Sequence, residues 1–263
     1  MGRVFLLYKK ERMVKMTNNI ICRRAKDIGE EEKEKISKEC FETADAIKFG
    51  TNYEDVSDHL FCDENSILTF IHDEKGKIKG FAISVNIAIN EKESLLHLHG
   101  VILSKDLQKK GLLGKITSKN IGYIEGENCW KGISSEVTAI SARTRNPALY
   151  KSVKSMCGEI YPESELDVVT EDIKEVLLAN PFVELPKDGT MIKKKAYVLP
   201  KPHTDVSDKD TNDLFGGLEE NDAVILYAGD IWNIDEKLYH EGLMEGFERE
   251  LDSEYKNFDY MEV

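Results

Sequence analysis

A glycine-bearing turn in the middle of the chain joins a strand-like run, Ser94–Leu103, to a helical pattern, Lys110–Glu127. The turn carries two glycines, Gly111 and Gly114. A turn of this kind at the start of a helix exposes unpaired backbone N–H groups and the positive end of the helix dipole, which together suit an anion such as pyrophosphate. Positive charge is added at the same place by three lysines, Lys109, Lys110 and Lys115.

The segments around this join alternate between strand-like and helical patterns. The turn Asp73–Gly76 lies between two β-branched runs and predicts a β-hairpin. The order predicts an α/β domain with a mixed sheet. The expected strands are Asn19–Ala25, Ser66–His72, Lys77–Ala88, Ser94–Leu103, Ile133–Ala142 and Glu159–Tyr161; the expected helices are Glu30–Ala44, Lys110–Glu127 and Pro147–Met156, with Asp45–Asp63 as a second helix or a lid.

The last hundred residues have a weaker pattern. It predicts helices at Thr170–Ala179 and Glu236–Leu251 and strands at Thr190–Leu199 and Ala223–Ala228. Two arrangements remain open: a small second lobe, or strands that complete the main sheet. We therefore divide the chain into an N-terminal extension (1–18), a domain (19–163) and an acidic α/β C-terminal extension or small lobe (164–263).

Charge is distributed unevenly over these parts. Residues 1–163 have a net charge of +2, whereas residues 164–263 carry −15, within a total of −13. The acidic part has no basic patch for a phosphate backbone, so we expect no nucleic-acid partner. Its negative field attracts cationic partners, although acidity for solubility alone explains it equally well.

The chain has the features of a soluble protein of a reducing compartment. No apolar run approaches the ~20 residues of a membrane span, so we expect no membrane association and a cytoplasmic location. The cysteines are odd in number and widely scattered, without a CxxC pair. This spacing argues against a disulfide framework and against a structural zinc site, and it predicts free, buried thiols.

The glycine turn and its surroundings resemble the GNAT (Gcn5-related N-acetyltransferase) superfamily. The segment Gln108–Leu113 matches the Gln and the first Gly of the family's Gln/Arg-x-x-Gly-x-Gly/Ala signature. It departs at the last place, where Leu113 replaces the small residue and the glycine follows one position later. After the next strand, Arg145–Tyr150 resembles the family's Asn…Tyr segment, with a shorter interval. The resemblance covers roughly Ile20–Pro162.

The resemblance implies a GNAT-like mixed, mostly antiparallel sheet flanked by helices, and an acyltransferase with acetyl-CoA as cosubstrate. An acetyl group would pass directly to a primary amine of a small basic molecule or of a cationic peptide or protein. The backbone from Gly100 to Leu103 would pair with the pantetheine arm, and the backbone N–H of Val101 or Ile102 would stabilise the oxyanion. The implied cofactor-binding residues are Val101, Ile102, Leu103, Gln108, Lys109, Lys110, Gly111, Leu112, Leu113, Gly114, Lys115 and Asn146.

Three residues are candidate catalysts. His97 occupies the strand position where several family members carry a catalytic glutamate, and His99 points to the same face of the strand. Histidine titrates in the range that a general base needs. Tyr150 matches the family's tyrosine that protonates the departing thiolate. For both histidines, packing and hydrogen bonding within the sheet remains an alternative, and Glu136 is a rival base. No third ligand accompanies the two histidines, so no metal is expected.

Two other interpretations of the sequence remain open beside that of an enzyme. One is a GNAT-fold module that binds acyl-CoA or a protein partner without catalysis, which Leu113 and the missing strand glutamate favour. The other is an interaction protein whose acidic part, residues 164–263, carries the function. A homodimer is an expectation from the family alone, because many members pair through strand edges.

Overall fold

The computed structural model of this protein describes residues 19–162, 170–183, 185–186, 191–197 and 209–259. Side chains are described as far as Glu254. The expected N-terminal extension lies outside the described residues. No helix in the described ranges combines the length and the apolar character that crossing a membrane requires.

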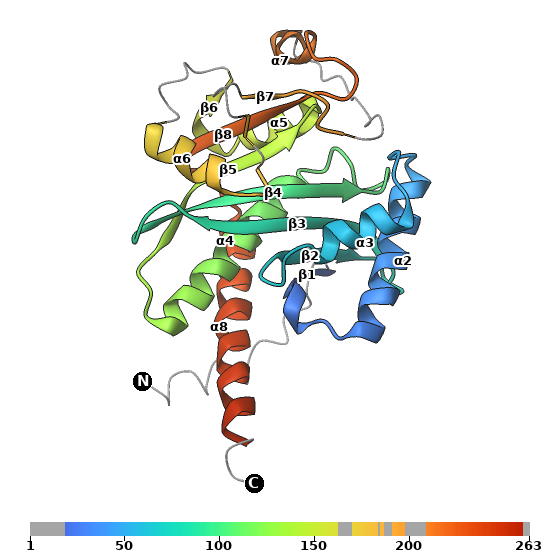
Figure 1. Cartoon of the computed structure of the whole chain (residues 1–263). Coiled ribbons are helices and arrows are strands. Elements are labelled where there is room, and N and C mark those ends of the chain that lie inside the picture. Colours follow the sequence, from blue (N-terminus) through green and yellow to red (C-terminus); the bar gives the residue numbers. More distant parts are fainter. Residues whose placement is uncertain (1–18, 163–169, 184, 187–190, 198–208, 260–263) are drawn as a thin grey trace.

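A single mixed sheet forms the centre of the molecule (Figure 1). Its strands follow the order β1-β2-β3-β4-β5-β8-β6, and β7 pairs with β8. The pair β4–β5 is parallel, whereas the other pairs in this sheet are antiparallel. The fold class expected from the sequence is confirmed. The strands are β1 (Asn19–Arg24), β2 (Ile67–His72), β3 (Ile78–Ala88), β4 (Glu93–Leu103), β5 (Glu136–Thr144), β6 (Cys157–Tyr161), β7 (Ile192–Lys193) and β8 (Ala223–Ile231).

The late strand β8 lies inside this sheet, between β5 and β6. It pairs with β5 from Val224 opposite Thr144 to Ala228 opposite Ile140, and with β6 from Tyr227 opposite Tyr161 to Ile231 opposite Cys157. The sequence left open whether the late strands form a small second lobe or complete the main sheet, and β8 completes the main sheet. The strand expected at Thr190–Leu199 is reduced to β7 within the described residues.

Helices cover both faces of the sheet. One face, here called the first face, carries α4 (Leu112–Lys131), α5 (Pro147–Lys154) and α8 (Glu236–Asp259). The second face carries α2 (Glu30–Ala46) and α3 (Tyr53–Phe61) over β2 and β3, and α6 (Glu171–Ala179) over β3, β4, β5 and β8. The short helix η1 (Ala25–Asp27) adds Ala25 to the core of the second face, and α7 (Lys209–Phe215) adds Phe215 to that of the first face.

Local sequence explains where the helices begin and end. Asn52 caps α3 by accepting a hydrogen bond from the Asp55 backbone N–H, and Thr170 caps α6 in the same way. Gly132 ends α4 in the left-handed conformation that glycine adopts without strain. Pro147 stands in the first turn of α5, where its missing N–H is harmless.

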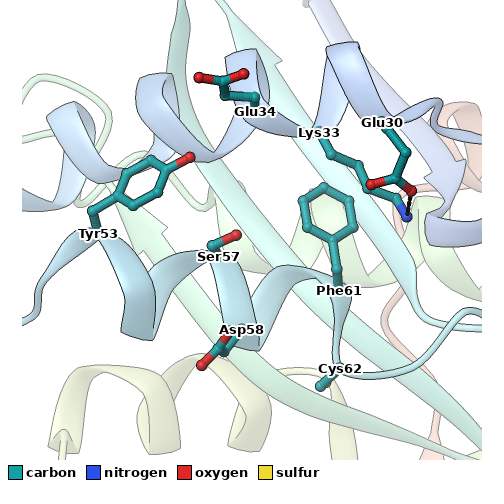
Figure 2. Close-up of a pocket in the computed structure, with 8 residues that line it drawn as sticks. All are labelled: Glu30, Lys33, Glu34, Tyr53, Ser57, Asp58, Phe61 and Cys62. Atoms are coloured by element: carbon teal, nitrogen blue, oxygen red, sulfur yellow. Dashed lines mark hydrogen bonds and ion pairs between the residues drawn. The ribbon is translucent and has the colours of Figure 1, made fainter.

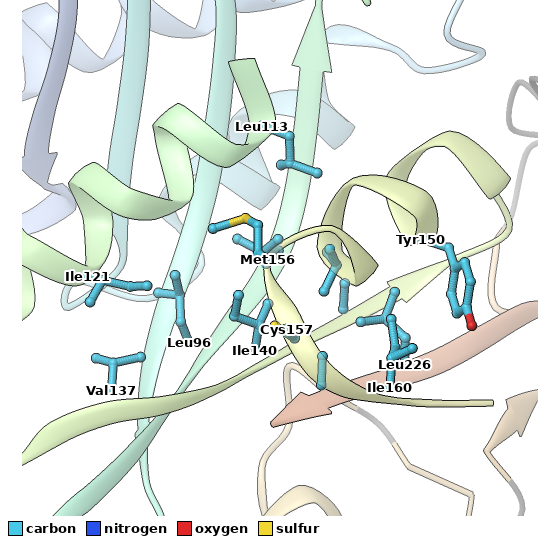
Figure 3. Close-up of a cluster of buried hydrophobic side chains, with 14 of the residues drawn as sticks. Leu96, Leu113, Ile121, Val137, Ile140, Tyr150, Met156, Cys157, Ile160 and Leu226 are labelled. Carbon is cyan, nitrogen blue, oxygen red and sulfur yellow. The ribbon is translucent and has the colours of Figure 1, made fainter. Parts of the chain in front are cut away.

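The core follows these layers. The largest cluster lies between the sheet and the first-face helices and joins residues such as Leu96, Leu113 and Tyr150 (Figure 3). Three cysteines are buried, but Cys62 and Cys129 are exposed. The expectation of buried thiols was therefore wrong for these two, because Cys62 follows the end of α3 and Cys129 lies on an exposed side of α4.

Helices α4 and α8 pack against each other through glycine (Figure 1). Gly122 and Gly126 of α4 touch the backbone of α8, and Gly242 and Gly246 of α8 touch the backbone of α4. The buried Lys119 of α4 donates a hydrogen bond to Glu245 of α8 at 2.7 Å. The C-terminal helix is thus an integral part of the first-face layer.

Candidate functional site

Strands β4 and β5 separate halfway along β4. Their parallel pairing runs from Glu93 opposite Glu136 to Leu98 opposite Ala142 and then ends. Beyond this point β5 pairs with β8, while β4 continues to Leu103 and pairs with β3. The edge of β4 that faces β5 therefore has no strand partner from His99 to Leu103 among the described residues. We call this opening the β4–β5 gap.

Backbone groups of β4 point into this gap. The Ser104 N–H donates to the carbonyl oxygen of Lys79 next to β3, at 2.9 Å. Because successive N–H groups of a strand point to opposite sides, the Ile102 N–H also faces β3, and those of Val101 and Leu103 face the gap. The Leu103 carbonyl oxygen accepts a hydrogen bond from the Gln108 side chain at 2.9 Å. Val101 thus offers both a donor and an acceptor to a ligand in the gap.

A β-bulge at His99 changes which side chains of β4 face each side. Ile83 pairs with Gly100 and Ser84 with Leu98, so His99 has no counterpart on β3. Before the bulge, Leu96 and Leu98 pack on the first face; after it, Ile102 packs on the second. A bulge of this kind redirects side chains and is frequent beside functional sites.

The N-terminus of α4 packs against the end of β4, where Leu112 shares a cluster with Val101 and Leu103. Gly111 is the N-cap residue in the left-handed conformation (φ 69°), and no side chain caps the helix. The first turn contains no acidic residue, and the Lys115 N–H is the first to find a carbonyl, that of Gly111. The preceding N–H groups remain available for an anion. Lys109 and Lys110 are exposed beside them.

Leu113, the departure from the family signature, lies in the core. Its side chain is 8% exposed and belongs to the same cluster as Met156 (Figure 3). The larger residue is therefore accommodated by packing between α4 and the sheet. Gly114 has room for a side chain, because an added Cβ would meet only the Met156 sulfur at 3.7 Å.

His97 is enclosed in the sheet. Its side chain is fully buried, and Nδ1 lies 2.8 Å from the Ser141 hydroxyl on β5. Burial, followed by the nearby His99 and Arg143, lowers the pKa of His97 to about 3, and the backbone of Phe182 opposes this shift. A neutral imidazole with so low a pKa is a weak base.

His99 connects His97 to the protein surface. Its ring centroid lies 6.1 Å from that of His97 and 5.3 Å from that of His59 on α3, on which it stacks. Phe182 contacts it edge-on at 5.6 Å. Burial, then His59 and Arg143, lower the pKa of His99 to about 4. The side chain of His59 is 44% exposed, so the three imidazoles form a row from solvent to the sheet interior.

The remaining candidates lie away from this row. Tyr150 is fully buried and packs against Phe215 at 5.7 Å between ring centroids. The Asn146 side chain accepts a hydrogen bond from the Ala148 N–H, so it caps α5. The rival base Glu136 is exposed at the opposite end of the β4–β5 pairing from the gap. No group of three His, Cys, Asp or Glu side chains suited to hold a metal occurs in the described part of the chain.

Two residues next to His99 had no signal in the sequence. His59 sits in a helix that the sequence left ambiguous, and Phe182 follows α6 in the acidic part of the chain. Both contacts join residues far apart in sequence, so neither pattern nor spacing points to them.

No protein-family model and no curated protein matches the sequence. Solved structures do show similarity. Arabidopsis thaliana NAA60 in complex with acetyl-CoA is 12% identical, with 54% of this chain and 86% of that chain covered and a TM-score of 0.35. A GNAT-family acetyltransferase from Bacillus anthracis is 11% identical over 55% and 84%, with a TM-score of 0.35. A phosphinothricin acetyltransferase from Sinorhizobium meliloti, in complex with acetyl-CoA, is 13% identical over 55% and 78%, with a TM-score of 0.34.

Proposed function

We propose that this protein is an N-acetyltransferase that moves an acetyl group from acetyl-CoA directly to a primary amine. The observation that carries the proposal is that the unpaired edge of β4 at the β4–β5 gap lies next to the uncapped N-terminus of α4. An extended arm can pair with the Val101 backbone while an attached pyrophosphate meets free N–H groups and lysines. The N–H groups in both halves of the site belong to the backbone, so the proposal is compatible with Leu113 at the last place of the signature.

Acetyl-CoA supplies an activated acetyl thioester, and the chain's own groups orient it. The Val101 N–H, directed into the gap, is placed to stabilise negative charge that develops on the carbonyl oxygen. Gln108 holds the end of β4 against the turn through Leu103. Lys109, Lys110 and Lys115 supply positive charge around the phosphates.

We assign the removal of the amine proton to His99 rather than to His97. His99 is less enclosed, stands at the bulge beside the gap, and contacts a histidine that reaches solvent. His97 and its bond to Ser141 would position the strand behind it. Tyr150 remains a predicted acid for the thiolate, although its full burial does not favour that role.

A charge placed at the turn tests the cofactor site. We expect Gly111→Glu to weaken acetyl-CoA binding by about tenfold or more relative to Gly111→Gln, because only the former puts a carboxylate beside the pyrophosphate. The two variants share the strain of a side chain at positive φ, and a Cβ at Gly111 meets no atom within 4 Å. Isothermal titration calorimetry of both variants and of the unaltered protein gives the answer. Absence of binding to the unaltered protein would refute the proposal.

A second experiment tests the base. We expect His99→Gln to lower kcat/KM for an amine acceptor by about 100-fold, in the range that general-base removal produces. Acetyl-CoA affinity should stay unchanged, since the variant leaves the α4 N-terminus intact. His240→Gln, at an exposed position on α8, serves as the control. A normal rate in His99→Gln would remove His99 from the mechanism.

The second candidate function is acyl-CoA binding without catalysis. The pKa values of about 3 for His97 and about 4 for His99 favour it, because both groups are weak bases at neutral pH. Binding of acetyl-CoA without acetylation of any amine in a broad panel would select this reading. The same panel, with protein N-termini and small basic amines among its members, would identify the class of acceptor.

A further inference from the structure

The C-terminal helix α8 begins beside the first turns of α4 and is bonded to them. Asp235 caps α8, because its carboxylate accepts a hydrogen bond from the Leu238 N–H at 3.1 Å and its carbonyl oxygen accepts one from the Tyr239 N–H at 2.9 Å. The Asp235 N–H in turn donates to the hydroxyl oxygen of Ser118 on α4, at 2.9 Å. The start of α8 is therefore held against α4 through the Ser118 side chain.

The same hydroxyl group reaches the turn that we assign to the pyrophosphate. Ser118 donates a hydrogen bond to the Gly114 carbonyl oxygen at 2.8 Å. Gly114 lies in the first turn of α4, whose N–H groups are available for an anion. One hydroxyl can make both bonds, since it has one donor and two acceptor lone pairs. A chain of hydrogen bonds thus runs from the cap of α8 through Ser118 to the cofactor turn.

Apolar packing joins the two helix starts a second time. Leu112, the first residue of α4, and Leu238 of α8 are buried in one cluster. Val101 and Leu103 of β4, at the β4–β5 gap, pack against the same cluster. Helix α8 thus contributes to the packing around both halves of the proposed cofactor site.

The middle of α8 has little freedom to move relative to α4. Backbone atoms of the two helices are in contact at the four glycines described above. Lys119, next to Ser118 in α4, donates a hydrogen bond to Glu245 of α8. Because close-packed interiors transmit displacements, a shift of α8 would change the Ser118 bonds and the Leu112 packing together.

We propose that α8 and Ser118 position the cofactor turn, so that binding of acetyl-CoA and docking of α8 stabilise each other. Ser118 is a positioning residue, because it acts on the cofactor through the turn at Gly114. Such a coupling is reciprocal, since a contact that improves cofactor affinity is itself strengthened by the cofactor. The inference rests on the proposed function only for the cofactor site, and it holds with or without catalysis. It gives a role to a helix outside the segment that resembles the GNAT superfamily.

Isothermal titration calorimetry with acetyl-CoA on Ser118→Ala tests the positioning role. The matched control is Thr117→Val, because the Thr117 hydroxyl is also buried but has no hydrogen-bond partner in the part of the chain that the structure describes. A second control, Ser152→Ala on α5, loses the same kind of hydroxyl-to-carbonyl bond. We expect the Kd to rise about fivefold in Ser118→Ala and less than about twofold in both controls. Circular dichroism and urea denaturation verify that each variant is folded under the conditions of the titration.

Hydrogen exchange measured by mass spectrometry on the unaltered protein tests the reverse direction. Saturating acetyl-CoA should slow the exchange of α8 amides at residues 239–247 by about fivefold more than that of α2 amides, the same factor as in the calorimetry. Helix α2 borders a pocket with α3 on the opposite face of the sheet (Figure 2), so it reports the general stabilisation that any bound ligand gives. In Ser118→Ala the excess protection of α8 should disappear.

The cofactor site and the coupling fail in different ways. Absence of acetyl-CoA binding to the unaltered protein would refute the cofactor site and the coupling with it. Binding with equal Kd values in Ser118→Ala and Thr117→Val, or equal protection of α8 and α2 by the ligand, would overturn the coupling alone.

Discussion

Alanine in place of any of four glycines at the α4–α8 contact is expected to destabilise the protein by at least about 3 kcal/mol, the upper range for overpacking a core. A Cβ would lie 2.0 Å from the Tyr239 carbonyl oxygen at Gly122 and 2.1 Å from that of Leu243 at Gly126. From α8, a Cβ would lie 2.1 Å from the Lys119 oxygen at Gly242 and 2.0 Å from the Tyr123 oxygen at Gly246. These obstacles are backbone atoms, so no side-chain rotation relieves the clash and the helices must separate.

Gly114→Ala provides the matched control on the same helix. The new Cβ meets the Met156 sulfur at an ordinary 3.7 Å, so the higher helix propensity of alanine should stabilise the protein by up to about 1 kcal/mol. Urea denaturation followed by circular dichroism compares the variants. Alanine at the four contact glycines should instead lower the free energy of unfolding, although helix propensity alone would favour alanine there too. Unchanged stability of Gly122→Ala would show that α8 does not lie against α4.

The contact between α4 and α8 could not be predicted from the sequence. The helical pattern at Lys110–Glu127 predicted α4, yet α4 buries polar residues such as Lys119 and Glu127 that no amphipathic pattern explains. They are buried between α4, strand β1 and α8: Lys119 bonds to the Ile20 carbonyl oxygen and to Glu245, and Glu127 pairs with Arg24 and with Arg249. The relevant signal was a spacing of four between glycines, present at Gly122 and Gly126 and again in α8. Because these pairs lie far apart in sequence, nothing showed that they meet.

The sheet was more accessible to prediction. The runs at Ser66–His72 and Lys77–Ala88 are bounded by turn residues and became β2 and β3 with shifts of one residue at their starts. The pairing of β8 between β5 and β6 was left open, since a strand's neighbours depend on contacts that its own sequence does not contain. A strand can thus mostly be predicted from its own residues, whereas the order of the C-terminal strands in the sheet cannot.

The two histidines of the candidate site were likewise only partly predictable from the sequence. Alternation along a strand was enough to place His97 and His99 on one face. Their electrostatics depend on groups outside the strand: Arg143 across the β4–β5 gap, His59 on α3 and the backbone of Phe182. The sequence alone favoured a histidine with an ordinary pKa. In the structure, burial changes both groups into weak bases, and the acid stability of the protein should reflect this.

Acidification from pH 6.5 to pH 4.5 is expected to cost about 5 kcal/mol of the free energy of unfolding through His97 and His99 together. The pKa of each falls from 6.5, to about 3 in His97 and about 4 in His99. Below pH 6.5 the unfolded chain binds a proton at each site and the folded protein does not. Each unit of pH therefore favours unfolding by about 1.4 kcal/mol per histidine. Above pH 6.5 neither state is protonated at these sites, and their contribution is constant.

Urea denaturation at half-unit steps between pH 7.5 and pH 4.5 measures this slope. Because total stabilities are typically about 5–15 kcal/mol, a loss of this size brings the protein close to its acid transition. His97→Gln removes one titrating group and can keep a bond to Ser141, so it should reduce the slope by about half. His240→Gln, at an exposed position, should leave it unchanged. If His97→Gln left the dependence of the unfolding free energy on pH unchanged, His97 would be protonated in the folded protein. That result would contradict a neutral, enclosed imidazole beside Ser141.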